Sequence, residues 1–346
     1  MSRFDAVIAT LEAGIDDRRY PGAVVEVGSA TGPSWQHAVG RLTYDPASAA
    51  VDHDTVFDLA SLTKVIATTS AVMRLVGRGT LSLADHVARR SRFWLRQDRA
   101  LVTVRDLLEH CAGLTAWLPL YRECATRLEF EAAIGQGALE YAPWTQSVYS
   151  DLGFMLLGFI VEEAGGAPLN ALLAEILEDD GVRFQAPDAW RSRTAPTEVD
   201  AWRGRLLVGE VHDENAWTLG GVAGHAGLFG TAPGVGAFAR LVLRTFTHAT
   251  RLGSPETLAR FVTRSTVPGS SRALGWDTML PTSSCGTRMS PRAIGHTGFT
   301  GTSLWIDPAA DRYVVFLTNR VHPSREGPPF SHVRARLHDA IADALA

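Results

Sequence analysis

The chain has 346 residues, of which 46% are hydrophobic and 20% charged, and its formal net charge is −4. This length and composition are ordinary for a globular protein with a large core, arranged as one domain or two. The basic residues are scattered, which argues against a nucleic-acid-binding surface. The cysteines, Cys111, Cys124 and Cys285, are odd in number and lack metal-ligand spacing, so a disulfide framework is not expected.

The N-terminal region predicts a helix followed by two strands. Apolar residues recur at helical spacing over residues 4–18, with acidic residues between them. A secretory signal would need a continuous apolar run, and no segment is long enough to span a bilayer, so we expect a cytoplasmic protein without membrane association. Residues 22–29 and 34–40 then form short β-rich runs joined by a turn-rich tetrapeptide.

The middle of the chain changes character twice. Residues 61–78 return to helical spacing, and the pattern stays mostly helical from about 82 to 178. Residues 181–235 are rich in Gly, Pro, Trp and Arg and show little periodicity. An irregular stretch of this length usually lines a functional site or wraps a domain.

The C-terminal part predicts helices, a hairpin and a last helix. Residues 236–247 and 255–264 have helical spacing, and so does the end of the chain, 331–345. Alternating β-rich runs at 301–308 and 312–320 flank a turn, which predicts an antiparallel hairpin.

This order of elements predicts that both ends of the chain build one α/β domain around an inserted helical domain. The predicted parts are an α/β first part at 1–80, a mostly helical domain at 81–215 and an α/β second part at 216–346. Domain interfaces are common places for active sites, so we expect the site where these parts meet.

Lys64 is the only lysine in the chain, since all other basic residues are arginines. Ser61 precedes it by three residues, which places both side chains on one face of a helix. A serine hydroxyl becomes a nucleophile when a neighbouring base takes its proton, and a lysine can lose a proton where an arginine cannot. By itself the pair also fits a capped helix with a solvated lysine.

Two further segments carry side chains that suit such a site. Tyr149 and Asp151 stand at the entry of a predicted helix, where a phenol beside an ammonium can act as a general base. A buried tyrosine with Asp151 as helix cap is the alternative. The segment 296–298, His-Thr-Gly, offers a titratable ring, a hydroxyl and close backbone approach, although it also fits a turn before a strand.

In this order and spacing, the three motifs resemble those of the penicillin-recognising serine hydrolases. The resemblance is greatest to the class C β-lactamase branch, which includes DD-carboxypeptidases and family VIII esterases, and residues 195–232 resemble a subgroup of proposed DD-carboxypeptidases. It implies an α+β fold of the β-lactamase/DD-peptidase type, in which N- and C-terminal helices flank an antiparallel sheet and a mostly helical domain is inserted.

The resemblance also implies a role for each motif, without any cofactor. Ser61 would be the acylated nucleophile, Lys64 would hold its proton network, and Tyr149 would act as base. The backbone N–H groups of Ser61 and Phe299 would form the oxyanion hole. The substrate-binding residues would be Asp151, His296, Thr297 and Gly298, with Thr297 at the polar end of the substrate.

Two positions depart from the usual pattern of the family. Asp151 stands where asparagine is commoner, and its carboxylate would favour the charged form of Lys64, which would then hold Tyr149 as a phenolate. His296 stands where β-lactamases usually have lysine, which weakens the expected attraction to a substrate carboxylate. The substrate is therefore expected to be a small ester, amide or peptide cleaved through an acyl-enzyme. A β-lactamase and a non-catalytic ligand-binding relative remain alternatives, and the oligomeric state stays open.

A group of acidic and imidazole side chains lies in the irregular region. Its members are His212, Asp213, Glu214 and His225. They lack paired helical spacing, and the family needs no metal, so no metal site is expected. The segment is expected to border the cleft.

Overall fold

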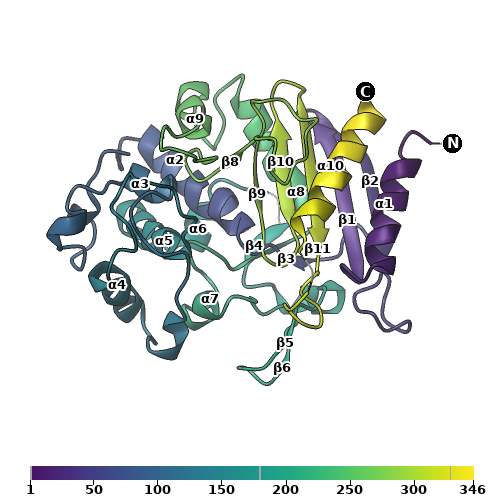
Figure 1. Ribbon diagram of the computed structural model, residues 1–346, viewed down its shortest axis with the longest axis horizontal. Helices are drawn as coiled ribbons and strands as arrows, with labels where there is room; N and C mark the ends of the chain where they lie inside the picture. Colours follow the sequence, from purple (N-terminus) through teal and green to yellow (C-terminus); the bar gives the residue numbers. More distant parts are fainter. Residues whose placement is uncertain (1, 179–180, 328) are drawn as a thin grey trace.

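The computed structural model describes residues 2–178, 181–327 and 329–346. An antiparallel sheet with helices on both faces fills one half of the molecule, and a group of helices fills the other (Figure 1). The helices at the two ends of the chain, α1 (Asp5–Asp16) and α10 (Ser331–Leu345), lie side by side against the sheet. The predicted α+β fold with terminal helices flanking an antiparallel sheet is therefore confirmed.

The main sheet combines strands from both ends of the chain in the order β2-β1-β11-β10-β9-β8. All adjacent pairs in it are antiparallel. The predicted C-terminal hairpin is β10 and β11, in which Ser303 pairs with Phe316. The strands are β1 (Gly22–Ser29), β2 (Gly32–Gly40), β8 (Asp277–Thr278), β9 (Ile294–Thr297), β10 (Ser303–Asp307) and β11 (Arg312–Thr318).

Successive residues of the central strands pack on opposite faces of the sheet. Val25 and Phe316 belong to a core cluster with residues of α1 and α10, whereas Val24 and Leu317 belong to the large cluster that includes α8 (Ala232–Thr245). Successive side chains of a strand point to opposite faces, so a strand buried on both faces is apolar nearly throughout. This explains why the β1 segment is mostly apolar, with Glu26 as its one charged residue.

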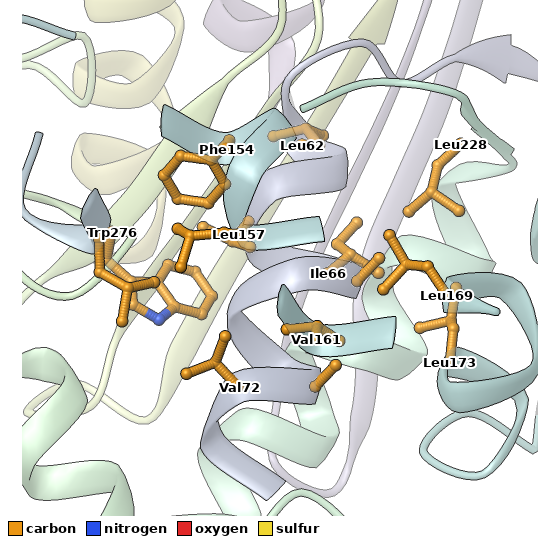
Figure 2. Packing of buried hydrophobic residues seen from close by; sticks show 14 of the residues in the cluster. Leu62, Ile66, Val72, Phe154, Leu157, Val161, Leu169, Leu173, Leu228 and Trp276 are labelled. Atoms are coloured by element: carbon orange, nitrogen blue, oxygen red, sulfur yellow. The ribbon is translucent and has the colours of Figure 1, made fainter. Parts of the chain in front are cut away.

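The helix that follows Ser61 begins in the interior of the molecule. Its first part is a π-helix, η1 (Lys64–Thr69), and an α-helix, α2 (Ser70–Gly77), continues it. All six residues of η1 are buried. Figure 2 shows Leu62 and Ile66 packed among side chains that include Phe154 of α5 and Leu169 of α6. The prediction of a regular helix over 61–78 missed the π-helical turn; such turns often occur at functional sites.

Of the remaining helical elements, α5, α6 and α9 pack against this buried helix. The α-helices are α3 (Val104–Leu108), α4 (Arg127–Gln136), α5 (Asp151–Gly165), α6 (Leu169–Ala174), α7 (Glu214–Thr218) and α9 (Pro255–Val262). The short 3₁₀ turns are η2 (Val87–Arg89), η3 (Gln97–Arg99), η4 (Leu120–Arg122) and η5 (Asp188–Arg193). Helix α8 begins four residues before the predicted 236, because Thr231 accepts a hydrogen bond from Gly234 N–H and caps it.

The region predicted to be irregular contains short strands that tie distant segments together. A small sheet has the order β3-β7-β4, and β5 pairs with β6. These strands are β3 (Phe57–Asp58), β4 (Val182–Phe184), β5 (Val199–Asp200), β6 (Arg205–Leu206) and β7 (Leu228–Gly230). Sheet β3-β7-β4 holds the segment just before Ser61 against residues more than one hundred positions later, which places the nucleophile candidate.

The predicted boundaries at 80/81 and 215/216 stay a prediction. One core cluster contains both Val24 of the sheet and Leu173 of α6. Among the described residues, no helix is both long and apolar enough to cross a bilayer.

Candidate active site

The turn that carries Ser61 is held by a buried carboxylate. Asp58, at the end of β3, accepts hydrogen bonds from the N–H groups of Ala60 at 2.8 Å and His212 at 2.7 Å. Ala60 has a φ of +48°, in the left-handed region that non-glycine residues seldom adopt. Burial raises the pKa of Asp58, and the two backbone donors oppose that rise. The arrangement presents Ser61 at the start of the buried helix.

Lys64 connects the other groups of the site. Its Nζ donates to Ser61 Oγ at 3.0 Å and to the carbonyl of His225 at 3.0 Å, and it lies 2.7 Å from Asp151 Oδ1. The side chain is fully buried. Burial lowers the pKa of Lys64, but the carboxylate charge of Asp151 and the hydrogen bonds of Asp151 and Tyr149 outweigh burial and raise it overall. The resting form is therefore an ammonium, in line with the effect expected of Asp151.

Tyr149 lies beside this ammonium. Lys64 Nζ is 4.9 Å from the centroid of the Tyr149 ring. Burial raises the pKa of Tyr149, and Lys64 together with a hydrogen bond to Ser61 opposes the rise without cancelling it. The expectation of a resting phenolate is therefore wrong: the cost of burying an anion exceeds the attraction of Lys64, and the resting side chain is a neutral phenol.

Ser150, and not Asp151, caps α5 by accepting from Gly153 N–H at 3.3 Å.

The predicted His-Thr-Gly segment is the end of strand β9. His296 pairs with Leu304 and Thr297 with Ser303 of β10, so the segment is a strand end and not only a turn. His296 Nδ1 lies 2.9 Å from the carbonyl of Thr297. Burial and the charge of Arg272 hold the pKa of His296 well below its usual value. His296 is therefore neutral near pH 7.

Gly298 follows at a point where the sheet meets the nucleophile turn. A Cβ atom there would lie 2.7 Å from the carbonyl oxygen of Leu59 and would collide with the hydroxyl of Thr302. That hydroxyl donates to the same carbonyl at 3.0 Å. Only glycine permits this approach, and it brings Phe299 to the cavity that Ser61 lines.

The backbone N–H groups of Ser61 and Phe299 are free in the part of the chain that the structure describes. Neither donates a hydrogen bond there, although both residues line the same cavity. Free amides facing one cavity are the elements of an oxyanion hole.

The cavity has a volume of about 910 Å³ and collects almost all predicted site residues. They are Ser61, Tyr149, Asp151, His296, Thr297, Gly298 and Phe299. Lys64 lies beneath them, fully buried. The predicted residues, which are spread along the sequence from Ser61 to Phe299, therefore meet at one place.

Four arginines also line this cavity, and the sequence analysis did not identify them. Arg325 is paired, with Glu198 at 2.6 Å and Glu214 at 2.7 Å. The other three, Arg272, Arg320 and Arg334, form no ion pair among the described residues. Arg320 and Arg334 donate to backbone carbonyls, and the Arg272 guanidinium lies 5.0 Å from the Tyr149 ring centroid.

The carboxylates of the cavity are already engaged. Asp58 accepts two backbone hydrogen bonds, Asp151 pairs with Lys64, and Glu214 pairs with Arg325. Asp213, which also lines the cavity, accepts from Ala216 N–H and lies 2.8 Å from His225 Nε2. The charged side chains left to meet a ligand anion are therefore Arg272, Arg320 and Arg334. Burial and the charge of Arg320 lower the pKa of Arg334 to about 9, which reflects how little solvent and how little negative charge surround it.

The acidic and imidazole side chains of the irregular region form hydrogen bonds. His212 Nε2 lies 2.8 Å from Glu198, and His225 Nε2 lies 2.8 Å from Asp213. Asp213 also caps α7 by accepting from Ala216 N–H at 2.7 Å. As expected, the segment borders the cleft.

Comparison with known proteins places this geometry in a family. The family model described as Beta-lactamase matches residues 5–336. The chain belongs to the beta-lactamase family. A relative from Escherichia coli (strain K12), named "Putative D-alanyl-D-alanine carboxypeptidase", is 31% identical over 305 residues, which cover 78% of this chain and 70% of the relative.

Several solved structures share the fold of this chain. A penicillin-binding protein homolog from Caulobacter crescentus has a TM-score of 0.80 at 18% identity, covering 99% of this chain and 98% of its own. A class C beta lactamase from Rhodobacter sphaeroides has a TM-score of 0.77 at 20% identity, covering 99% and 100%. EstCE1, described as a hydrolase with promiscuous acyltransferase activity, has a TM-score of 0.78 at 21% identity, covering 98% of both chains.

The sequence did not predict those groups of the site that belong to no sequence motif. The arginines stand at unrelated positions of the chain, and nothing in their spacing marks them. The same holds for the backbone carbonyl of His225, which becomes a ligand of Lys64 only through the fold.

Proposed function

We propose that this member of the beta-lactamase family is a serine hydrolase that cleaves an ester or amide through an acyl-enzyme on Ser61. The observation that carries the proposal is the position of the Lys64 ammonium between Ser61 Oγ and Asp151, with Tyr149 beside it. Such a group of side chains can lower the cost of removing the proton from serine and can stabilise the charge that develops.

In the proposed reaction, Ser61 Oγ forms a bond to the substrate carbonyl carbon as its proton passes to the phenolate of Tyr149. The carbonyl oxygen becomes an oxyanion next to the N–H groups of Ser61 and Phe299. The leaving group departs with the proton from Tyr149, and a water molecule then releases the acyl group by the same steps. Because the resting Tyr149 is a phenol, the reactive phenolate is a minor form at neutral pH.

We propose further that the substrate carries a carboxylate. Arg272, Arg320 and Arg334 leave positive charge in the cavity without an acidic partner among the described residues. Their positive charge can replace that of the lysine which β-lactamases usually have at the position of the neutral His296. The terminal carboxylate of a D-alanyl-D-alanine peptide has the required charge, and the curated relatives carry the name of that carboxypeptidase activity.

A neutral-ester hydrolase is the second candidate. The neutral imidazole of His296 supports it, since that side chain attracts a substrate anion weakly. The same cavity could also belong to a β-lactamase or to a ligand-binding protein without catalytic activity.

Labelling and a substrate panel test these proposals. A fluorophosphonate should add to the wild-type chain at Ser61 and not to Ser61→Ala, as read by mass spectrometry of the labelled peptide. An absent adduct would favour the ligand-binding protein. Hydrolysis of a D-Ala-D-Ala peptide, p-nitrophenyl butyrate and nitrocefin then separates the carboxypeptidase, the neutral esterase and the β-lactamase, and equal activity of Ser61→Ala would overturn the assignment of the nucleophile.

A further inference from the structure

His110 lies in the turn that ends α3, and its ring packs against the ring of Tyr149. Its carbonyl oxygen accepts from Val148 N–H at 3.0 Å, and its ring Nδ1 accepts from Ser150 N–H at 3.0 Å. The ring itself lies 4.8 Å from the Tyr149 ring, between centroids. One residue therefore binds the neighbours of Tyr149 on both sides and packs against its side chain.

We propose that His110 is the positioning residue that sets Tyr149 against Ser61 and Lys64. The proposal rests on the proposed function of Ser61 and Tyr149, and it assigns His110 no contact with substrate. It explains how Tyr149 is held, because the backbone of Tyr149 itself makes no hydrogen bond within the described residues. Its place depends on the two amides that flank it.

The hydrogen bond to Ser150 determines the chemical form of the His110 ring. A nitrogen that accepts from an N–H carries no proton, so the proton of the neutral ring is on Nε2. A charged ring would have hydrogen on both nitrogens and would lose this bond. Burial and the positive charges of Arg272 and Lys64 keep the pKa of His110 well below its usual value, so the ring stays neutral and the bond persists across ordinary pH.

The backbone of His110 also fits this role. Its φ is +57°, a left-handed conformation that directs the carbonyl and the ring toward the same segment of chain. Tyr141 reinforces the contact, because its hydroxyl donates to the same carbonyl at 2.9 Å. A strained conformation kept at such a place usually serves the site it supports. His110 is buried, with 2% of its surface exposed. If its ring were removed, water could not take its place as acceptor for the Ser150 N–H.

Substitution of His110 by alanine and by asparagine tests the proposal. Asparagine tolerates a positive φ and carries an oxygen near the position of Nδ1, so it can accept from Ser150, whereas alanine cannot. We expect His110→Ala to slow fluorophosphonate acylation of Ser61 by roughly 10- to 100-fold, because small displacements of a reacting group have effects of this size. His110→Asn should recover the rate to within about threefold of wild type.

A matched variant separates positioning from stability. Val104→Ala empties buried volume in α3, the short helix that precedes His110, but removes no hydrogen bond to residues 148–150. At a similar loss of Tm it should acylate like the wild type. Hydrogen exchange at the Ser150 amide should be faster in His110→Ala only, which is a readout independent of catalysis.

The outcomes distinguish this proposal from the proposed function. If the wild-type chain labels at Ser61 and His110→Ala labels equally fast, the positioning role is wrong while the function stands. Equal slowing in Val104→Ala, or no recovery in His110→Asn, would likewise overturn it. Absence of any Ser61-dependent label in the wild type would instead refute the proposed function.

Discussion

The ammonium of Lys64 lies 2.7 Å from a carboxylate oxygen of Asp151, and the lysine side chain is fully buried while that of aspartate is 18% exposed. Asparagine, commoner at this position of the resembling proteins, would leave the ammonium without a counter-charge. The pair therefore determines the charge state of the lysine next to the nucleophile, and its loss should be visible in stability.

Asp151→Asn should lower the free energy of unfolding by about 1–3 kcal/mol at pH 7. Breaking a buried pair costs up to about 5 kcal/mol, and the partial exposure of Asp151 and the remaining amide oxygen reduce that cost. The raised pKa of Lys64 stabilises the fold fully below the unfolded-state value of 10.5 and ceases to do so only as the pH rises through the higher folded-state value. Urea unfolding should thus give the same difference at pH 7 and pH 9; a difference that vanishes by pH 9 contradicts an ammonium at rest.

Lys64→Arg should abolish acylation and keep the fold. The charge and the pairing with Asp151 can persist, but a planar guanidinium is larger and has no room among Ser61, Asp151 and the His225 carbonyl. We expect at least about a thousandfold slower burst with p-nitrophenyl butyrate, a size typical of removing a member of a catalytic group. Circular dichroism supplies the folding control, and a wild-type burst would contradict the requirement for lysine.

The rate of acylation should rise with pH from 6 to 9. The reaction needs the phenolate of Tyr149 beside Ser61, and the pKa of Tyr149 is raised, so the reactive fraction grows as the pH rises. Lys64 stays an ammonium over this range, because its pKa is raised as well. The measurement is kcat/KM against pH with a neutral ester, whose own charge does not change. Tyr149→Phe should lose this rise along with most activity. A profile that falls above pH 7 would argue against the phenolate base.

Arg272→Gln should weaken binding of a carboxylate-bearing substrate selectively. A hydrogen bond between charged groups contributes about 1.5–3 kcal/mol, so KM for a D-Ala-D-Ala peptide should rise roughly 10- to 100-fold. The same peptide with an amidated C-terminus should show little change. Arg292→Gln is the matched control, because Arg292 is exposed and lies outside this cavity. Equal effects on the acid and the amide would exclude recognition of the carboxylate by Arg272.

Gly298→Ala should impair the oxyanion site. The added methyl group would displace Thr302 or push Leu59 away, and either movement shifts the Phe299 amide relative to Ser61. We expect activity to fall at least about tenfold and stability to fall by about 1–3 kcal/mol, as for other overpacked positions. Gly32→Ala, where a Cβ meets nothing within 4 Å, should change neither quantity. Unchanged turnover in Gly298→Ala would show that the close approach is not needed.

Local sequence patterns sufficed for much of the fold. The apolar periodicity of 331–345 and the two β-rich runs that became β10 and β11 predicted elements within a few residues of their bounds. The π-helical turn at Lys64 was missed, because hydrophobic spacing over one turn does not distinguish i+4 from i+5 hydrogen bonding. The strands β4 and β7 were missed because two or three residues are too few to show alternation.

The candidate site divides in the same way. Ser61, Lys64 and Tyr149 could be named from the sequence, because the order and spacing of their motifs resemble those of a known family and each residue type suits its role. Their protonation could not: burial depends on the surrounding fold, and it makes Tyr149 a phenol at rest. The sequence by itself therefore determined which groups can react. The tertiary structure alone decided how the charges of Asp151 and Arg272 act on them and that His110 holds Tyr149, because Coulomb interactions and hydrogen bonds depend on distances in space and not along the chain.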